Sequence, residues 1–184
     1  MSSNLMPDFI PYAKITLLCR ISNIHDAVRI TLLLVGATDK KYILEGTEDY
    51  QKRLIHYIPF EIKVIPDVKN SRNLSADQQK EREGKALLDQ VSTSDELVLL
   101  DVDGTEFSSS GLATWIEKKM LAGTRQVVIA VGGPYGFSEA VYKRANSKMS
   151  LSRLTFPHQL VRLLFIEQLY RAMTIIKGEP YHHA

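Results

Sequence analysis

The stretch that decides the fold is "VIAVGGPYGFS", residues 128–138. Its apolar run is typical of a buried strand, and the strand breaks into a glycine-rich turn. The chain then restarts at Ser138, a residue type that caps helices. Strand, glycine turn and helix in this order form the usual cradle for a nucleotide phosphate. The first question is therefore what this turn binds: a dinucleotide, another cofactor, or nothing.

A dinucleotide does not fit this turn. The order Gly132-Gly133-Pro134-Tyr135-Gly136 departs from G-x-G-x-x-G, and Pro134 removes one N–H from the cradle. About 20 positions on, where an acidic ribose-binding residue would stand, the chain reads Thr155-Phe156-Pro157. No P-loop sequence is present either. The residues alone leave two readings: a tight structural turn, or one wall of a different kind of site.

Segments on both sides of the turn alternate between strand and helix patterns. We expect strands at 29–36, 60–65, 96–101, 126–131 and 151–156. We expect helices after a cap at Thr38 or Asp39, from a Ser75/Gln78 capping box to about residue 91, at 108–121, at 138–145, and onward from Pro157. This alternation predicts an α/β domain with a mainly parallel sheet.

The domain is predicted to span residues 28–184, and residues 1–27 are interpreted as an N-terminal extension of doubtful structure. Apolar residues make up 45% of the chain and charged residues 24%, as in soluble globular proteins. No apolar run reaches the roughly 20 residues of a membrane helix, and the N-terminus lacks a secretory signal pattern. Cys19 is the single cysteine, and the adjacent His182 and His183 do not share a helix face, so no metal site is predicted. These features favour a cytoplasmic protein that does not contact a membrane.

Positive charge gathers at the C-terminal end. The formal net charge is only +2, but residues 142–184 hold seven Lys/Arg against two Glu. An acidic partner is expected to meet this end of the chain. A solvated basic face is the alternative interpretation.

Several motifs together resemble one family. They are "VGGPYGFS" (131–138), "SLSRLTFPHQLVRLLFIEQLYRA" (150–172) and "GEPYHH" (178–183), preceded by "ITLLLVG" (30–36), "YQKRL" (50–54), "PFEIKVIPD" (59–67), "KEREG" (80–84) and "LLDVDGTEFSS" (99–109). In this combination the chain resembles the SPOUT-class ribosomal RNA large subunit methyltransferase H family, which methylates N3 of a pseudouridine in 23S rRNA. The resemblance covers about residues 28–183.

The resemblance implies a SPOUT-type fold in which the C-terminal part passes through a loop to give a trefoil knot. It implies that the knotted loops bind S-adenosylmethionine, that two subunits pair as a homodimer, and that the substrate is 23S rRNA in the assembled ribosome. The opening question would then have an answer: the glycine turn is one wall of a methyl-donor pocket.

Three stretches would form that pocket. The residues assigned to it by the resemblance are Leu100, Gly132, Gly133, Arg153, Leu154, Thr155, Phe156, Pro157 and His158. A Cβ at either glycine is expected to collide with the cofactor, because only bare backbone allows a close approach. Plain core packing is the alternative for Leu100 and Phe156.

A protonated imide nitrogen is a weak nucleophile, so a base or a stabilising cation is expected to assist. The candidates for this catalytic role are Glu167, His182 and Arg171. Those expected to contact RNA are Arg162, Arg171, Tyr181 and His182. An ordinary ion pair is the alternative for Glu167 and Arg171, which lie four residues apart on one helix face.

Two other functions remain open from the residues. One is a non-catalytic module that binds ribosome or RNA with the same fold. The other is a flavodoxin-like nucleotide-binding protein. Binding of S-adenosylmethionine would separate the enzyme from both.

Overall fold

A computed structural model describes residues 28–67 and 74–182, so the predicted extension at 1–27 lies outside the described residues. Five strands form one sheet: β1 (Arg29–Val35), β2 (Phe60–Ile65), β3 (Glu96–Glu106), β4 (Gln126–Val131) and β5 (Ser147–Ser150). The helices are α2 (Lys41–Leu54), α3 (Ala76–Leu88), α4 (Ser109–Leu121), α5 (Glu139–Arg144) and α6 (His158–Lys177). The strand order is β2-β1-β4-β3-β5, and every neighbouring pair is parallel. The predicted α/β class is confirmed.

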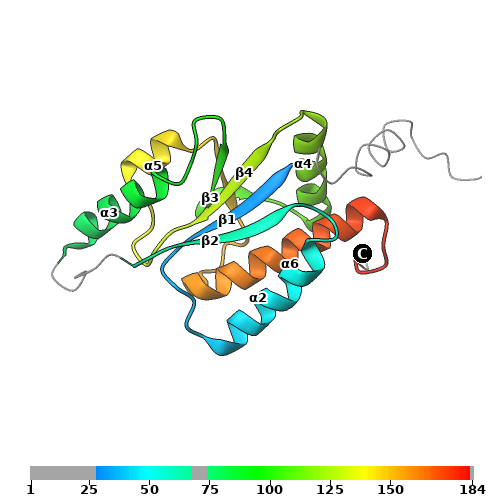
Figure 1. Cartoon of the computed structure of the whole chain (residues 1–184), viewed down its shortest axis with the longest axis horizontal. Helices are drawn as coiled ribbons and strands as arrows, with labels where there is room; N and C mark the ends of the chain where they lie inside the picture. The colour runs from blue at the N-terminus through cyan, green and yellow to red at the C-terminus, as the bar shows by residue number, and fades with distance from the viewer. Residues whose placement is uncertain (1–27, 68–73, 183–184) are drawn as a thin grey trace, which may run out of the picture.

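Helices cover both faces of the sheet. In Figure 1, α3 and α5 lie on one side, and α2 and α6 on the other. Ile30, Leu32 and Leu34 of β1 belong to the core that contains Phe165 of α6. The intervening Leu33 and Val35 pack in a second core with α3 and α5. The inner strands β1 and β4 are apolar on both faces for this reason, as buried parallel strands generally are.

Local side-chain caps start two of the five described helices, α3 and α4, whereas Ser138, at the predicted cap position of α5, makes no such bond. Ser75 and Gln78 form the predicted capping box, with the Gln78 N–H donating to Ser75 Oγ at 3.2 Å. Ser108 caps α4 in the same way, accepting from the Gly111 N–H at 3.0 Å. The predicted cap at Thr38 or Asp39 is wrong, because α2 begins after Lys40, which makes no side-chain cap bond.

Side chains from α6 explain that difference. The main-chain N–H groups of Asp39 and Lys40 donate to Gln159 Oε1 at 3.2 and 3.4 Å. The Thr38 hydroxyl accepts instead from Arg162. A distant helix thus satisfies the groups that a local cap would otherwise serve.

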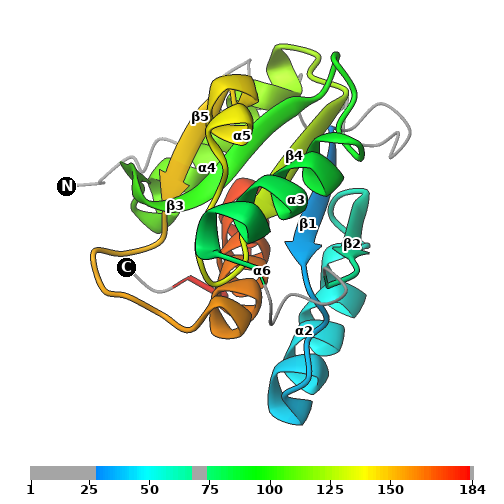
Figure 2. The ribbon, with the colours of Figure 1, turned by 90° about the vertical axis from the view of Figure 1, so that its left-hand side faces the viewer.

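The fifth strand was predicted at 151–156 but lies at Ser147–Ser150. Residues 151–156 form a loop, which Ser152 folds locally: its carbonyl accepts from Ser150 Oγ at 3.0 Å, and its own Oγ accepts from the Leu154 N–H at 3.0 Å. Serine hydroxyls commonly compete with sheet pairing in this way. Figure 2 shows this loop between the end of β5 and the start of α6.

Helix α6 holds the layers together and ends at Gly178, whose φ of 71° is left-handed. One side of it is buried against the sheet, α2 and α4. None of the helices within residues 28–67 and 74–182 combines the length and apolar character needed to cross a membrane.

Candidate functional site

Two adjoining cavities open at the carboxyl end of β4 and beside Leu100, where β3 stops pairing with β4. Parallel sheets usually bind ligands at this edge. The larger has a volume of about 570 Å³, and the smaller about 90 Å³. Leu100 and Phe156 line both cavities. The larger one falls within the usual size of a small-molecule site.

The structure brings together most residues predicted to hold a cofactor. Those lining the larger cavity are Leu100, Gly132, Gly133, Phe156, Pro157 and His158. Leu154 and Thr155 line the smaller one. Arg153 lines neither, because its side chain is 90% exposed and lies 3.4 Å from Glu106 in an ion pair. Of the segment 153–158 that the prediction places opposite the glycine turn, Phe156, Pro157 and His158 share the larger cavity with Gly132 and Gly133.

The glycine turn is tight. Gly136, with a φ of 79°, donates its N–H to the carbonyl of Gly133 at 3.1 Å. A Cβ on Gly132 would lie 3.3 Å from the main chain of Gly136 and from the Phe137 ring. A Cβ on Gly133 would lie 2.4 Å from Glu83 Oε2. The nearest obstacles to a side chain at either glycine are thus atoms of this chain, a cause the sequence did not suggest.

Glu83 is a site residue that the sequence reasoning missed. It is 5% exposed, and its Oε1 accepts from Gln79 Nε2 at 2.7 Å. Its Oε2 has no hydrogen-bond partner among the described residues, and the same holds for the buried Ser138 Oγ. Burial raises the pKa of Glu83, and the nearby Asp67 raises it further. The hydrogen bond from Gln79 and the nearby His158 both lower it. The available signal was its place in "KEREG", directly before a helical glycine that packs closely on Ser138.

Tyr142 was also missed. Its hydroxyl donates to Asp101 Oδ2 at 2.5 Å, and both residues line the larger cavity. Burial, together with Asp101, raises the pKa of Tyr142 to about 12. The pair therefore offers the cavity a neutral phenol and a carboxylate at neutral pH.

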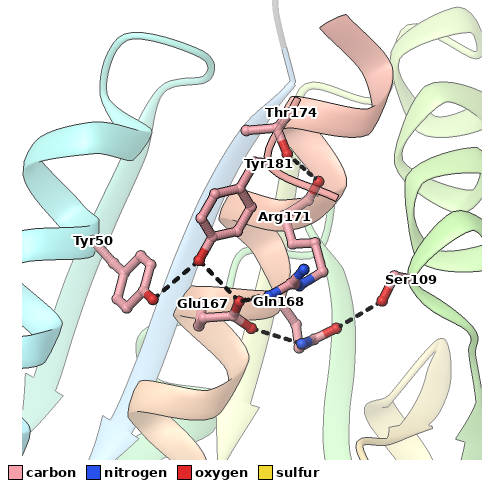
Figure 3. Close-up of polar contacts among 7 residues, drawn as sticks. All are labelled: Tyr50, Ser109, Glu167, Gln168, Arg171, Thr174 and Tyr181. Atoms are coloured by element: carbon pink, nitrogen blue, oxygen red, sulfur yellow. Dashed lines mark hydrogen bonds and ion pairs between the residues drawn. The ribbon is translucent and has the colours of Figure 1, made fainter. Parts of the chain in front are cut away.

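Two of the predicted catalytic residues, Glu167 and Arg171, form a second cluster on α6 (Figure 3). Arg171 donates from Nε and Nη2 to Glu167 Oε1 at 3.1 and 2.6 Å, the ion pair that their spacing allowed. Gln168 Nε2 donates to Glu167 Oε2 at 2.6 Å, and Tyr181 donates to Glu167 Oε1 at 3.2 Å. The Glu167 carboxylate thus accepts four hydrogen bonds, about as many as its two oxygens have lone-pair sites.

The C-terminal residues pack on this cluster. The Tyr181 hydroxyl also shares a 3.2 Å hydrogen bond with that of Tyr50 from α2 (Figure 3). The Tyr181 and Tyr170 rings meet edge-on, with their centres 4.8 Å apart. The guanidinium of Arg171 lies 4.8 Å from the centre of the Tyr181 ring. Burial and these hydroxyl contacts raise the pKa of Tyr181. His182 follows, with a buried Nδ1 that has no partner among the described residues.

Arg162 does not belong to this surface. It is 1% exposed, and its Nη1 and Nη2 donate to Thr38 Oγ1 at 2.6 Å and to the Val35 carbonyl at 2.7 Å. This buried position does not fit the predicted RNA contact: two guanidinium nitrogens bond inside the fold, and the buried Nε has no partner among the described residues. Burial also lowers its pKa.

The two clusters are separate within one chain. Glu167, Arg171, Tyr181 and His182 line neither cavity. Glu167 is six residues beyond Val161, which also lines both cavities, and this places it about 9 Å farther along the helix axis. Within the described part of the chain, no group of three or more His, Cys, Asp or Glu side chains could hold a metal ion.

Comparisons with known proteins agree with the motifs. Residues 28–182 match the family model described as predicted SPOUT methyltransferase. The ribosomal RNA large subunit methyltransferase H of Parabacteroides distasonis is 56% identical over 156 residues, which are 85% of this chain and 99% of that protein. That of Flavobacterium johnsoniae is 52% identical over the same shares. The SpoU methyltransferase AviRb of Streptomyces viridochromogenes, solved with AdoMet, is 13% identical, with a TM-score of 0.40 over 84% of this chain and 60% of that one.

Proposed function

This chain belongs to the SPOUT-class ribosomal RNA large subunit methyltransferase H family, and we propose that it transfers a methyl group from S-adenosylmethionine to N3 of a pseudouridine in 23S rRNA. The observation that carries the proposal is the single cavity of about 570 Å³ shared by Gly132, Gly133 and the segment from Phe156 to His158. The names of the relatives support ribosomal RNA as the substrate. The reaction would take place in the cytoplasm on the assembled ribosome.

The residues present fit this methyl donor. Leu100 and Phe156 supply apolar surface for a purine ring, and the glycine turn exposes main-chain groups beside it. Glu83 Oε2 is a buried acceptor without a partner directly behind Gly133, and it suits a ligand that carries positive charge. The bound donor would supply an electrophilic methyl group on a positively charged sulfur.

The acceptor nitrogen must lose its proton. Its electron pair would then form a bond to the methyl carbon that the bound donor supplies. The carbon–sulfur bond would break at the same time, and the electrons of that bond would remain on sulfur. Arg171 would stabilise the negative charge of the deprotonated imide, and His182 would take the proton. Glu167 would act as a positioning residue, because its carboxylate already holds Arg171 and Tyr181.

We also propose a homodimer, since the cavity and the α6 cluster are separate within one chain. The larger cavity is bordered by Val102, which is 65% exposed, and the smaller by Leu154, which is 70% exposed. Such apolar surface beside a cavity is typical of an interface. A second subunit docked there would bring its α6 cluster toward the cavity. The trefoil knot implied by the resemblance remains part of this proposal.

Methylation of ribosomes that lack the modification tests the function. The full chain, labelled S-adenosylmethionine and large subunits from cells without this protein should give one methyl group on 23S rRNA, located by mass spectrometry. Phe156→Asp should abolish donor binding in calorimetry, whereas Leu121→Asp, at an exposed apolar residue of α4, should not. Ribosome binding without donor binding would instead favour a non-catalytic RNA-binding module.

A further inference from the structure

Glu83 carries a buried carboxylate oxygen that no described residue satisfies. Its Oε1 accepts from Gln79 Nε2, whereas Oε2 has no partner within residues 28–67 and 74–182, and the residue is 5% exposed. Burying a charge without a partner is unfavourable by several kcal/mol in general. Because no described residue compensates this oxygen, we expect a proton or a bound cation to do so.

The position of the oxygen suggests which. Glu83 Oε2 lies against Gly133, at the place where any other residue would put its Cβ. Gly133 itself lines the larger cavity. Because Gly133 has no side chain, only its backbone lies between the Glu83 carboxylate and that cavity. The charged groups that act on Glu83 are Asp67, which is also negative, and His158 on the cavity wall. Ser138, which packs against the neighbouring Gly84, also has a buried Oγ without a partner among the described residues.

We propose that Glu83 makes the cavity select for a ligand with positive charge on its reacting sulfur, and so favours the methyl donor over its demethylated product. This inference rests on the proposed function. Transfer of the methyl group leaves the electron pair on sulfur, so the sulfonium becomes a neutral thioether. The carboxylate attracts the sulfonium, whereas the thioether carries no net charge at that position. The product would accordingly be released more easily than the donor.

Calorimetry on the full chain separates this role from a structural one. The probes are S-adenosylmethionine, S-adenosylhomocysteine, and sinefungin, which carries an ammonium in place of the methylated sulfur. Glu83→Gln should weaken binding of the two cationic ligands about tenfold and that of S-adenosylhomocysteine less than about twofold. The matched control is Glu81→Gln, which removes the same charge from an exposed position on α3 and should change none of the three affinities.

A second variant and a second readout guard against a folding defect. Glu83→Asp keeps the charge and should retain the preference for the cationic ligands, and thermal melts should show that both variants fold. In the wild-type chain the preference should diminish at acidic pH, where Glu83 is protonated. An equal loss for all three ligands in Glu83→Gln, or no loss, would overturn the inference and leave the methyltransferase proposal intact. A wild-type chain that binds none of the three ligands would overturn both.

Discussion

The guanidinium of Arg162 donates a 2.7 Å hydrogen bond to the main-chain carbonyl of Val35, 127 residues earlier in the chain. A second bond, to Thr38 Oγ1, ties the same side chain to the segment that leads into α2. The first turns of α6, which form one wall of the cavity, are thereby fixed to the end of β1. This contact gives Arg162 a role inside the fold.

Replacing Arg162 by methionine should destabilise the protein. The change leaves the buried Val35 carbonyl and the half-buried Thr38 hydroxyl without this donor, at a cost of about 3 kcal/mol in the free energy of unfolding. Urea denaturation measures this loss. Ribosome binding at a temperature where the variant is folded should be unchanged, and a weaker ribosome complex with unaltered stability would restore the RNA contact predicted from the sequence.

The candidate site shows which functional residues sequence patterns can predict and which they cannot. The motif residues Gly132, Gly133 and Phe156–His158 could be placed in one pocket because the family resemblance joins segments that periodicity cannot. Arg162 and Glu83 could not be assigned, since charged residues at helical spacing normally face solvent. Their burial depends on partners from β1 and the glycine turn, which only the tertiary structure brings near.

The missed strand has a similar cause. Residues 151–156 have the apolar content of a strand, yet Ser152 turns the chain through side-chain hydrogen bonds. The preceding residues, Ser147–Ser150, pair with β3 although they are polar or small apart from Met149. Tertiary pairing here overrides local propensity.

Gly133→Ala should weaken donor binding and stability together, because its Cβ would lie 2.4 Å from Glu83 Oε2. Shortening the partner relieves the contact, so in a Glu83→Ala background the same glycine change should cost about 1 kcal/mol less in unfolding free energy. A double-mutant cycle of denaturation curves measures the coupling. Strictly additive losses would mean that the two residues do not press on each other.

The stability of the free chain should depend on pH through Glu83. Burial raises its pKa above the ordinary value of 4.5, so the folded state binds this proton more tightly than the unfolded chain does. The stability it contributes is therefore complete below pH 4.5 and is lost as the pH rises through the raised pKa. Glu83→Gln, which cannot ionise, should be more stable than the wild type at pH 7.5 by about 1–3 kcal/mol.

That advantage should shrink toward pH 4, and denaturant titrations at the two pH values measure it. Glu81→Gln, at an exposed position of the same helix, should show no such difference. A Glu83→Gln variant less stable than the wild type at pH 7.5 would mean that the carboxylate already has a stabilising partner in the free chain. If Glu83→Gln is instead more stable and less selective, both results have one cause: the carboxylate is unfavourable in the free chain and favourable beside a bound cation.

Glu167→Gln should separate catalysis from donor binding. The glutamine retains an acceptor for Tyr181 but loses the charge that holds the Arg171 guanidinium at 2.6 and 3.1 Å. Because a displaced cation no longer meets the developing imide charge, kcat for ribosome methylation should fall about tenfold or more. The Kd for S-adenosylmethionine should stay within about twofold, since Glu167 lines neither cavity.

The matched control is Glu45→Gln, which breaks the exposed pair of Lys41 and Glu45, also four residues apart on one helix. Such a pair contributes little, so both kcat and Kd should remain at wild-type values. A parallel fall of kcat and donor affinity in Glu167→Gln would place Glu167 in contact with the donor and contradict a positioning role. An unchanged kcat would reduce the Glu167–Arg171 pair to the ordinary surface ion pair that its spacing alone allows.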